Sequence, residues 1–375
     1  MVLISCTSSR FLRYQNVPAP SGDYLVGSKI FEWTDSSRAD IFSIKDDVFR
    51  KIIVQVWYPG KNHSEENENF SYFQNDEITA TKLANHFSVP KAFVAGAVKL
   101  KTHALMNLDP LLKNAPYPLI IFSHGRGGYR HQNSIQCEEL ASRGYVVVAV
   151  NHTYDSFITI FRDGSSAPYL SEKLKEDSTG KNITITTPEK LELRVGDARF
   201  LLDQIDDLRH KNPLFKIIDL NKIGMFGHSF GGATTIAMAN EDRRIDAAAG
   251  LDAWFIPLSD TIIKEGMKIP FLHLGQRRWA GMPKNYSKMK DLFNNSSAPV
   301  HHLSANRMKH YDFTDGPQYA SSAKILIPFF SWENRSEMRK MLNTMIIVFF
   351  DLHLKNKSGE SINQAARKFS KILIN

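Results

Sequence analysis

The amino-acid sequence predicts one α/β domain, built on a mostly parallel central sheet with helices on both faces. Short apolar runs at 118–122, 145–150 and 245–251 alternate with longer stretches that have helical spacing. Nearly continuous apolar runs are typical of strands buried on both faces, and their alternation with helices is typical of parallel sheets. The chain has 375 residues, of which 42% are hydrophobic and 23% charged, so it is long enough to bury such a core.

The elements are expected in a definite order along the chain. Two strands at 23–31 and 51–58 are rich in β-branched and aromatic residues, and an amphipathic helical insert follows at about 77–115. After the insert, strands and helices alternate, and we expect them at 118–122, 130–143, 145–150, 191–209, 222–226, 231–240, 245–251, 269–274, 300–303 and 335–355.

No repeat and no shift in composition divides the chain. We therefore expect a single domain over 20–355, a flexible tail at 1–19 and a basic tail at 356–375. Leu3–Cys6 is similar to the end of a bacterial lipoprotein signal, in which Cys6 would be acylated, but the basic and apolar regions of such a signal do not precede it. A truncated signal and an ordinary tail both stay open, so the location is not predicted, and an exported or envelope lipoprotein would require a start further upstream.

Charge and composition argue against several function classes. Lys and Arg number 47 against 39 Asp and Glu, and the net charge of +8 favours anionic surfaces, but the basic residues are scattered and form no nucleic-acid-binding module. The longest apolar stretch, 345–350, is much shorter than the roughly 18 residues of a membrane-spanning helix. Cys6 and Cys137 are too few for a disulfide framework, and no Cys or His spacing predicts a metal site.

The stretch 222–232, KIGMFGHSFGG, carries the predicted chemistry. It places Ser229 in the pattern Gly-x-Ser-x-Gly between an expected strand and an expected helix, which is typical of a nucleophile elbow. Gly227 and Gly231 leave room for a strained turn that exposes the hydroxyl near the positive end of the helix dipole. The pentapeptide alone is a weak signal, so the strand before it, the helix after it and Gly232 carry the prediction.

A serine nucleophile needs a histidine base and an orienting carboxylate, which in this kind of fold follow the serine along the chain. The histidines after Ser229 are His273, His301, His302, His310 and His353. His310 falls in an expected loop after the last strand, so we expect it to be the base. Asp252 directly follows the expected strand at 245–251, at the carboxyl end where active sites of open sheets gather, and is the expected acid. The alternative acids are Asp246, Asp260 and Asp291.

Two backbone amides are expected to bind the oxyanion that such a reaction forms. One is the N–H of Phe230, directly after the expected nucleophile. The other is expected in the loop 123–128, SHGRGG, where the main chain of Arg126 would donate. A plain glycine turn before a helix is the alternative interpretation of this loop.

These motifs resemble those of the platelet-activating factor acetylhydrolases of the secreted and type II kind, with their bacterial relatives. The similarity spans roughly 20–355, and its pieces are PLIIFSHG at 118–125, GYVVVAV at 144–150, GHSFGG at 227–232, GLDAW at 250–254 and His-x-x-Phe-x-Asp at 310–315. The resemblance implies an α/β-hydrolase fold that needs no metal or cofactor. The site residues that it implies are the triad Ser229, Asp252 and His310, the oxyanion-hole amides of Phe230 and Arg126, and the substrate-binding residues His228, Trp254 and Phe313.

The expected function is a serine ester hydrolase that removes short or oxidised acyl chains from platelet-activating-factor-like phospholipids through an acyl-enzyme. A general carboxylesterase or polyester hydrolase with the same triad is the alternative, and a catalytically inert binding protein is a remote one. The position of Arg126 is usually apolar in the better-known family members, and the insert also differs. Acyl-chain and head-group preferences are therefore not implied by the resemblance.

The expected partner is a lipid or a small ester, and nucleic acid is not expected. The oligomeric state is not predicted. The insert and the basic tail could contact a membrane, because apolar faces with basic rims suit interfacial binding, or they could pack against the domain. The charges of the basic tail region are Lys355, Lys357, Arg367, Lys368 and Lys371 against Glu360.

Overall fold

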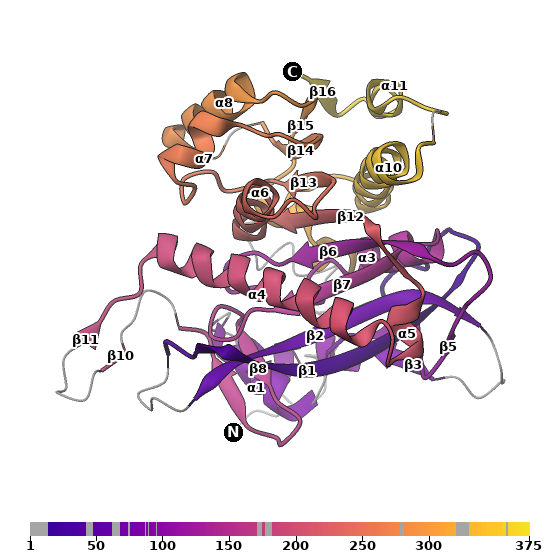
Figure 1. The fold of residues 1–375 in the computed structure, drawn as a ribbon, viewed down its shortest axis with the longest axis vertical. Helices are drawn as coiled ribbons and strands as arrows, with labels where there is room; N and C mark the ends of the chain where they lie inside the picture. Colours follow the sequence, from indigo (N-terminus) through magenta and orange to yellow (C-terminus); the bar gives the residue numbers. More distant parts are fainter. Residues whose placement is uncertain are drawn as a thin grey trace, which may run out of the picture.

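The computed structural model describes residues 14–42, 48–61, 68–73, 76–86, 88, 90–94, 96–170, 175–176, 182–277, 279, 281–319, 330–357 and 359–375. At its centre is a 12-stranded sheet with the order β16-β15-β14-β13-β12-β6-β7-β2-β1-β4-β3, and β5 pairs with β2 (Figure 1). The strands are β1 (Leu25–Ala39), β2 (Phe49–Lys61), β3 (Asn69–Ser71), β4 (Lys101–Met106), β5 (Asp109–Pro110), β6 (Tyr117–Ser123), β7 (Val146–Asn151), β12 (Ile218–His228), β13 (Ala247–Leu251), β14 (Phe271–Gln276), β15 (Val300–Ala305) and β16 (Ile372–Ile374). Two small hairpins outside this sheet are β8 (Ile158–Ile160) with β9 (Ser166–Pro168), and β10 (Lys175–Glu176) with β11 (Asn182–Ile183).

Helices cover the sheet on both faces. They are α1 (Asp76–His86), α2 (Lys91–Val94), α3 (Ser134–Ser142), α4 (Thr187–Leu208), α5 (Pro213–Lys216), α6 (Phe230–Glu241), α7 (Asp260–Glu265), α8 (Pro283–Asn295), α9 (Gly316–Tyr319), α10 (Arg335–Lys355) and α11 (Ile362–Arg367), with the 3-10 turns η2 (Ala97–Lys99) and η3 (His310–Phe313). Figure 1 shows α7 and α8 on one side of the later strands, and α10 and α11 on the other side. In the described part of the chain, we find no helix that is both long and apolar enough to span a membrane.

The strand directions confirm the predicted mostly parallel sheet. Each pair of neighbours from β7 through β6, β12, β13 and β14 to β15 is parallel, whereas β2 runs antiparallel to both β1 and β7. The carboxyl ends of β6, β12, β13, β14 and β15 therefore lie along one edge of the sheet. Loops that leave this edge can bring residues together that are far apart in the sequence.

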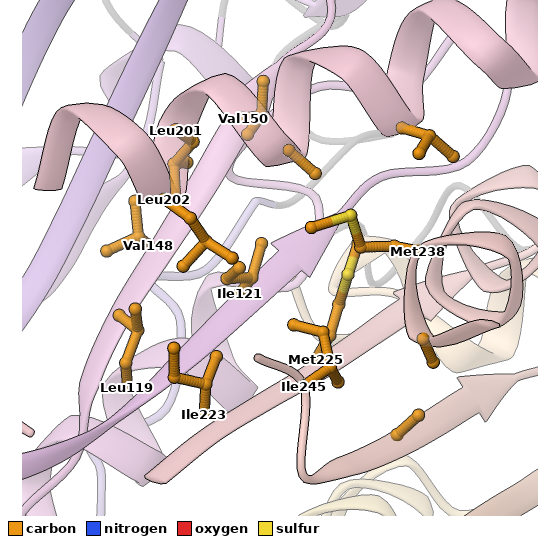
Figure 2. Packing of buried hydrophobic residues seen from close by; sticks show 14 of the residues in the cluster. Leu119, Ile121, Val148, Val150, Leu201, Leu202, Ile223, Met225, Met238 and Ile245 are labelled. Carbon is orange, nitrogen blue, oxygen red and sulfur yellow. The ribbon is translucent and has the colours of Figure 1, made fainter. Parts of the chain in front are cut away.

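Two hydrophobic cores lie on the two faces of the sheet because the central strands β6 and β7 are apolar at almost every position. Along β6, Leu119 and Ile121 pack into the core under α4 and α6, whereas Ile120 and Phe122 pack into the core under α3 and α10. Figure 2 shows the first of these cores, in which side chains of α4 lie against those of β6, β7 and β12. Successive side chains of a strand point to opposite faces of the sheet. Because both faces are buried here, both sets of side chains are apolar, and the sequence shows continuous apolar runs rather than alternation.

The expected helical insert at 77–115 is only partly helical. The helices α1 and α2 and the turn η2 occupy its first half, but β4 and β5 occupy its second half. β4 pairs with β1 and β3, and its buried residues alternate, with Thr102 and Ala104 pointing inward. The prediction of a helix in this second half was wrong because a few apolar residues in a short window fit either period.

Both expected tails are at least partly folded onto the domain. At the start, the backbone N–H of Gln15 donates to Tyr319, and Val17 is buried; residues 1–13, with Cys6, lie outside the described residues. At the end, α11 packs against α10, and β16 pairs antiparallel with β15. The expectation of a basic C-terminal tail is therefore corrected: the segment completes the sheet.

The basic side chains of this last segment form ion pairs within the domain. Lys357 lies 2.9 Å from Asp351, and Lys368 lies 2.8 Å from Glu360. Lys371 contacts both Glu333, at 2.5 Å, and Glu337, at 3.0 Å. These pairs favour packing against the domain over contact with an anionic surface.

Candidate active site

Ser229 lies at a sharp turn between β12 and α6, as the sequence predicts. Its backbone has φ 56° and ψ −116°, a combination that L-residues rarely adopt and that surrounding structure must hold in place. A Cβ added at Gly227 would come within 2.2 Å of the Gly231 carbonyl oxygen, and one at Gly231 within 1.9 Å of the Ser123 carbonyl oxygen. The glycines are therefore required by close backbone approach. The turn places Ser229 at the amino end of α6, where the helix dipole is positive.

Asp252 and His310 meet at the same edge of the sheet. Asp252 follows β13, and His310 opens η3 in the loop after β15. The Nδ1 atom of His310 lies 2.6 Å from Oδ2 of Asp252; the aspartate side chain is 1% exposed and the histidine side chain 26%. A carboxylate only accepts, so Nδ1 carries the proton and Nε2 is the ring nitrogen that can accept one.

Backbone hydrogen bonds hold the serine turn against the aspartate loop. The N–H of Ser229 donates to the carbonyl oxygen of Leu251 at 3.0 Å, and the N–H of Trp254 donates to that of Ser229 at 2.9 Å. These two bonds flank Asp252 on both sides in the sequence. Together with the contact between His310 and Asp252, these bonds join the loops of all three residues expected as a triad.

Asp252 has further donors that the sequence did not reveal. Gln276 donates to it from both its backbone N–H, at 2.9 Å, and its side-chain Nε2, at 2.8 Å. Trp279 donates its Nε1–H to Oδ1 at 2.8 Å, and its ring centroid lies 4.7 Å from that of His310. Hydrogen bonds to an ionised group are among the stronger ones, so these donors fix the carboxylate. The only sequence signal was the position of Gln276 at the end of β14, next to the end of β13.

His228 links the histidine loop to the glycine loop after β6. Its Nε2 lies 2.9 Å from the carbonyl oxygen of His310, and its Nδ1 lies 2.8 Å from Nε2 of Gln132. The Oε1 of Gln132 in turn accepts the backbone N–H of Gly125 at 2.9 Å. Burial, with a smaller contribution from His310, lowers the pKa of His228 to about 3, so its ring is neutral. His228, expected to bind substrate, is only 1% exposed and bridges two loops.

The loop 123–128 approaches the serine turn closely. A Cβ added at Gly125 would lie 3.4 Å from the Cβ of Ser229. The next peptide group is that of Arg126, the residue expected to give the first oxyanion-hole amide. Phe230, expected to give the second, is fully buried and begins α6, where the first N–H groups of a helix have no partner within the helix.

The other two residues expected to bind substrate, Trp254 and Phe313, differ in their exposure. Trp254 is half-buried; its ring lies 5.7 Å from the guanidinium carbon of Arg126 and 5.5 Å from the ring of Phe230. Phe313 is fully buried in the core under α3 and α10 and exposes no surface to a substrate. Trp254 therefore stays the candidate, whereas Phe313 has the contacts of a packing residue.

The alternative residues lie elsewhere. Asp246 accepts the N–H of Ile223 at the opposite end of β13, and Asp260 and Asp291 are exposed on α7 and α8. His273 is buried within β14, and the other histidines are on β15 and α10: His301, His302 and His353. Within the described residues, no group of three or more His, Cys, Asp or Glu could hold a metal ion.

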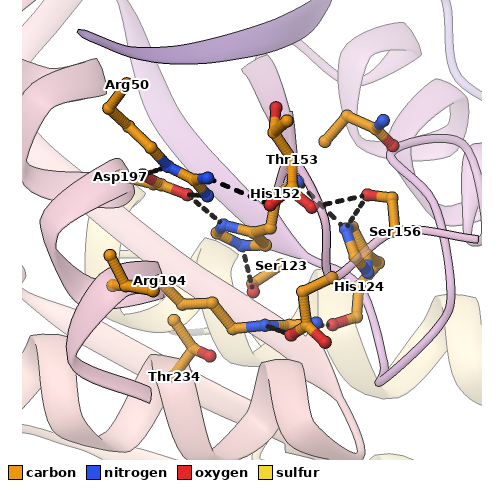
Figure 3. A network of polar contacts seen from close by, with 12 residues as sticks. Arg50, Ser123, His124, His152, Thr153, Ser156, Arg194, Asp197 and Thr234 are labelled. Atoms are coloured by element: carbon orange, nitrogen blue, oxygen red, sulfur yellow. Dashed lines mark hydrogen bonds and ion pairs between the residues drawn. The ribbon is translucent and has the colours of Figure 1, made fainter. Parts of the chain in front are cut away.

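A second serine, histidine and aspartate form a similar chain of contacts beneath the glycine loop (Figure 3). Ser123 Oγ lies 3.0 Å from His152 Nε2, and His152 Nδ1 lies 3.0 Å from Asp197 Oδ2. Arg50 donates twice to Asp197, and burial lowers the pKa of His152 to about 4. At most 1% of each member of this set is exposed, so a substrate cannot reach Ser123. Contact geometry alone therefore does not identify a reactive serine, and access must be considered as well.

The arrangement around Ser229, which is 7% exposed, has the parts that acyl transfer requires. It combines a hydroxyl on a strained turn, an imidazole oriented by a buried carboxylate, and a glycine loop next to a helix amino end. Such a set can move a proton from the hydroxyl to the imidazole and bind a negatively charged oxygen.

Known proteins resemble most of the chain. The model of the family described as "Platelet-activating factor acetylhydrolase, isoform II" matches residues 10–364. The platelet-activating factor acetylhydrolase of Canis lupus familiaris is 28% identical over 308 residues, 75% of this chain and 64% of that protein. A probable 1-alkyl-2-acetylglycerophosphocholine esterase of Arthroderma benhamiae is 27% identical over 249 residues, 63% of this chain and 58% of that protein. The match therefore spans less than two thirds of the length of these curated relatives.

A solved structure supports the fold over nearly the full length. The ferulic acid esterase of Streptomyces cinnamoneus superimposes with a TM-score of 0.77 at 26% sequence identity, covering 96% of this chain and 99% of that one. The predicted α/β-hydrolase fold is thus confirmed.

Proposed function

The chain belongs to the platelet-activating factor acetylhydrolase, isoform II, family, and from this premise we propose that it is a serine ester hydrolase. Its proposed substrates are platelet-activating-factor-like phospholipids, from which it would remove short or oxidised acyl chains. One observation carries the proposal: the pair His310–Asp252, with a separation of 2.6 Å, stands at the sheet edge where the strained turn presents Ser229.

The proposed reaction begins with attack on the ester. Ser229 Oγ adds to the carbonyl carbon while its proton passes to Nε2 of His310, and the carbonyl electrons move onto the oxygen. The amides of Phe230 and Arg126 bind this oxyanion. The intermediate collapses when the ester bond breaks, and the imidazolium returns its proton to the leaving alcohol.

Water completes the cycle. His310 takes a proton from a water molecule, and the resulting hydroxide adds to the acyl carbon. The second tetrahedral intermediate then releases the acid, while the His310 imidazolium returns its proton to Ser229 Oγ and restores the hydroxyl. Asp252 holds the imidazole in one tautomer and stabilises its charged form throughout. Its remaining donors, Gln276 and Trp279, keep the carboxylate in place while the charge on the imidazole changes.

The substrate class rests on the family and on the names of the relatives, which are acetylhydrolases and an acetylglycerophosphocholine esterase. A general carboxylesterase with the same triad remains the second candidate, because the structural neighbour is named a ferulic acid esterase. Lys357, Lys368 and Lys371 of the last segment form ion pairs within the domain, so we do not propose this segment as a membrane contact.

A fluorophosphonate probe with two matched variants tests the nucleophile. The S229A variant should lose labelling entirely, whereas S123A should keep it, because Ser123 has a similar set of contacts but is only 1% exposed, against 7% for Ser229. Labelling that persists in S229A would place the nucleophile elsewhere. The purified enzyme should then be offered platelet-activating factor, a long-chain phosphatidylcholine and methyl ferulate. Faster turnover of the ferulate than of platelet-activating factor would favour the second candidate.

A further inference from the structure

The carbonyl oxygen of Gly125 accepts three hydrogen bonds. The donors are Nδ1 of His124 at 2.7 Å, the backbone N–H of Gly128 at 2.9 Å, and Nη2 of Arg194 at 3.3 Å. A peptide carbonyl has two lone pairs, so this oxygen is saturated. It belongs to the peptide bond whose nitrogen is that of Arg126.

His124 can donate to this carbonyl in only one tautomer. Its Nε2 atom is approached by the backbone N–H of His152 at 3.2 Å, and a backbone N–H can only donate. Nε2 is therefore unprotonated, and Nδ1 carries the hydrogen. Burial, together with the nearby charge of Arg194, lowers the pKa of His124 well below its ordinary value, which keeps the ring neutral.

Arg194 reaches the same loop from α4 (Figure 3). Its Nη1 donates to the carbonyl oxygen of His124 at 2.6 Å, beside the contact with Gly125, and its Nε donates to Asp155 at 2.5 Å. Asp155 accepts the backbone N–H of Gly127 at 3.1 Å through its own carbonyl. The side chain of Arg194 is only 1% exposed, so the fork is held in one orientation.

The guanidinium of Arg194 also contacts the second proposed donor residue. Its carbon lies 4.6 Å from the ring centroid of Phe230, within the range of a cation–π contact. The buried Arg194 side chain therefore contacts Phe230 itself and Gly125, the residue before Arg126. Phe230 and Arg126 are the residues that would supply the oxyanion-hole amides.

We propose that Arg194 is a positioning residue that sets the oxyanion hole, by holding the Gly125–Arg126 peptide and the Phe230 ring. The proposal rests on the proposed esterase function. In a trans peptide the C=O and N–H point in opposite directions, so a carbonyl fixed toward α4 turns the Arg126 N–H away from α4. Because Gly125 lies against Ser229, the Arg126 amide is held beside the serine. Donors to the carbonyl also polarise the peptide and strengthen its N–H as a donor.

The test compares two fully buried arginines of the same network. R194K removes the fork that holds the His124 and Gly125 carbonyls. R50K is the matched control, because Arg50 is equally buried and binds Asp197 and the Thr153 carbonyl without contacting the 124–128 loop through the hydrogen bonds described. For each protein, kcat and KM are measured with p-nitrophenyl acetate, and Ki with a trifluoromethyl ketone that forms a tetrahedral oxyanion adduct. All values are expressed per active site, titrated with a fluorophosphonate.

R194K should lower kcat about 10- to 100-fold and raise the Ki of the ketone by a similar factor, whereas KM should stay within about twofold of the wild-type value. R50K should lower thermal stability but leave these values within about twofold of wild type. Per-site values in R194K that match those of R50K would overturn the inference, and so would a raised KM with unchanged kcat. If R194K does not fold, D155N replaces it, because this substitution removes the charge that holds the Arg194 Nε. D155N should show the same pattern of kcat and Ki changes more weakly. Unchanged kcat and Ki in D155N would count against the inference.

Failure of the underlying function gives a different result. A wild-type protein that neither hydrolyses the ester nor binds the ketone would overturn both proposals. A wild-type protein that does both, with R194K equal to it, would overturn only the role of Arg194.

Discussion

The Nε2 atom of His228 lies 2.9 Å from the main-chain carbonyl oxygen of His310, 82 residues later in the chain. A carbonyl only accepts, so Nε2 carries the hydrogen and Nδ1 accepts from Gln132. The two rings are 4.5 Å apart between centroids, and His228 is neutral because burial lowers its pKa to about 3. The residue before the proposed nucleophile therefore fixes the backbone of the proposed base without placing a second positive charge beside it.

This relationship predicts different effects for two substitutions of His228. In H228Q the Gln Nε2 can take the position of the imidazole Nε2 and keep the donor to His310. In H228L the volume is similar but the donor is lost. We expect kcat to fall about 10-fold in H228L and much less in H228Q, because an unpaired buried carbonyl costs about 1–3 kcal/mol. Steady-state kinetics measure this difference, and equal losses in the two variants would mean that His228 acts through packing alone.

Trp279 gives a second prediction about the proposed acid. W279F keeps an aromatic ring next to His310 but removes the Nε1–H that donates to Asp252 at 2.8 Å. The carboxylate then has one fewer donor to hold its orientation, so we expect kcat to fall about 10-fold, since hydrogen bonds to charged groups contribute about 1.5–3 kcal/mol. KM should change little. The control is W332F, because the Trp332 side chain is 76% exposed; kcat equal in the two variants would contradict the role of Trp279.

The sequence revealed those parts of the site whose geometry is encoded locally. Ser229 was predictable because its glycines, the strand before it and the helix after it are contiguous. Asp252 and His310 were predictable from their positions after strands of one parallel sheet. Gln132 and Trp279 were not, since their contacts join loops that only the finished fold brings together.

The fold shows the same division between local and long-range information. The central strands were predictable because their apolar runs are continuous and bounded by helices. β4 was taken for part of a helix because its apolar positions are too few to define a period. The three-residue strand β16 was missed because a strand so short is defined by its partner β15 rather than by its own sequence.

Acid should destabilise the folded protein before the carboxylates titrate. Burial lowers the pKa of His152 to about 4 and that of His228 to about 3, against about 6.5 for an unfolded chain. Below pH 6.5 the unfolded state binds more protons than the folded state, so the free energy of unfolding falls as the pH falls. Between pH 7 and 5 we expect each of these histidines to account for a loss of about 2 kcal/mol.

Urea unfolding at pH 7, 6 and 5 measures this loss. In H228Q it should be smaller than in the wild type by about 2 kcal/mol, whereas H210Q, at an exposed histidine, should leave it unchanged. The same pH dependence in H228Q and wild type would show that His228 is not held neutral by the fold.

The last strand gives a prediction about stability rather than catalysis. In β16, Ile372 is 9% exposed and packs into the core under α10, whereas its neighbour Leu373 is 38% exposed on the other face of the strand. I372A removes buried methyl groups beside β15, so we expect the free energy of unfolding to fall by about 2–3 kcal/mol. L373A should change it by about 0.5 kcal/mol or less, because it leaves no cavity. Urea unfolding of both variants at neutral pH makes the comparison. Equal, small effects would mean that the segment after α10 does not contribute to the sheet, and that the sequence-based expectation of a tail was the better description.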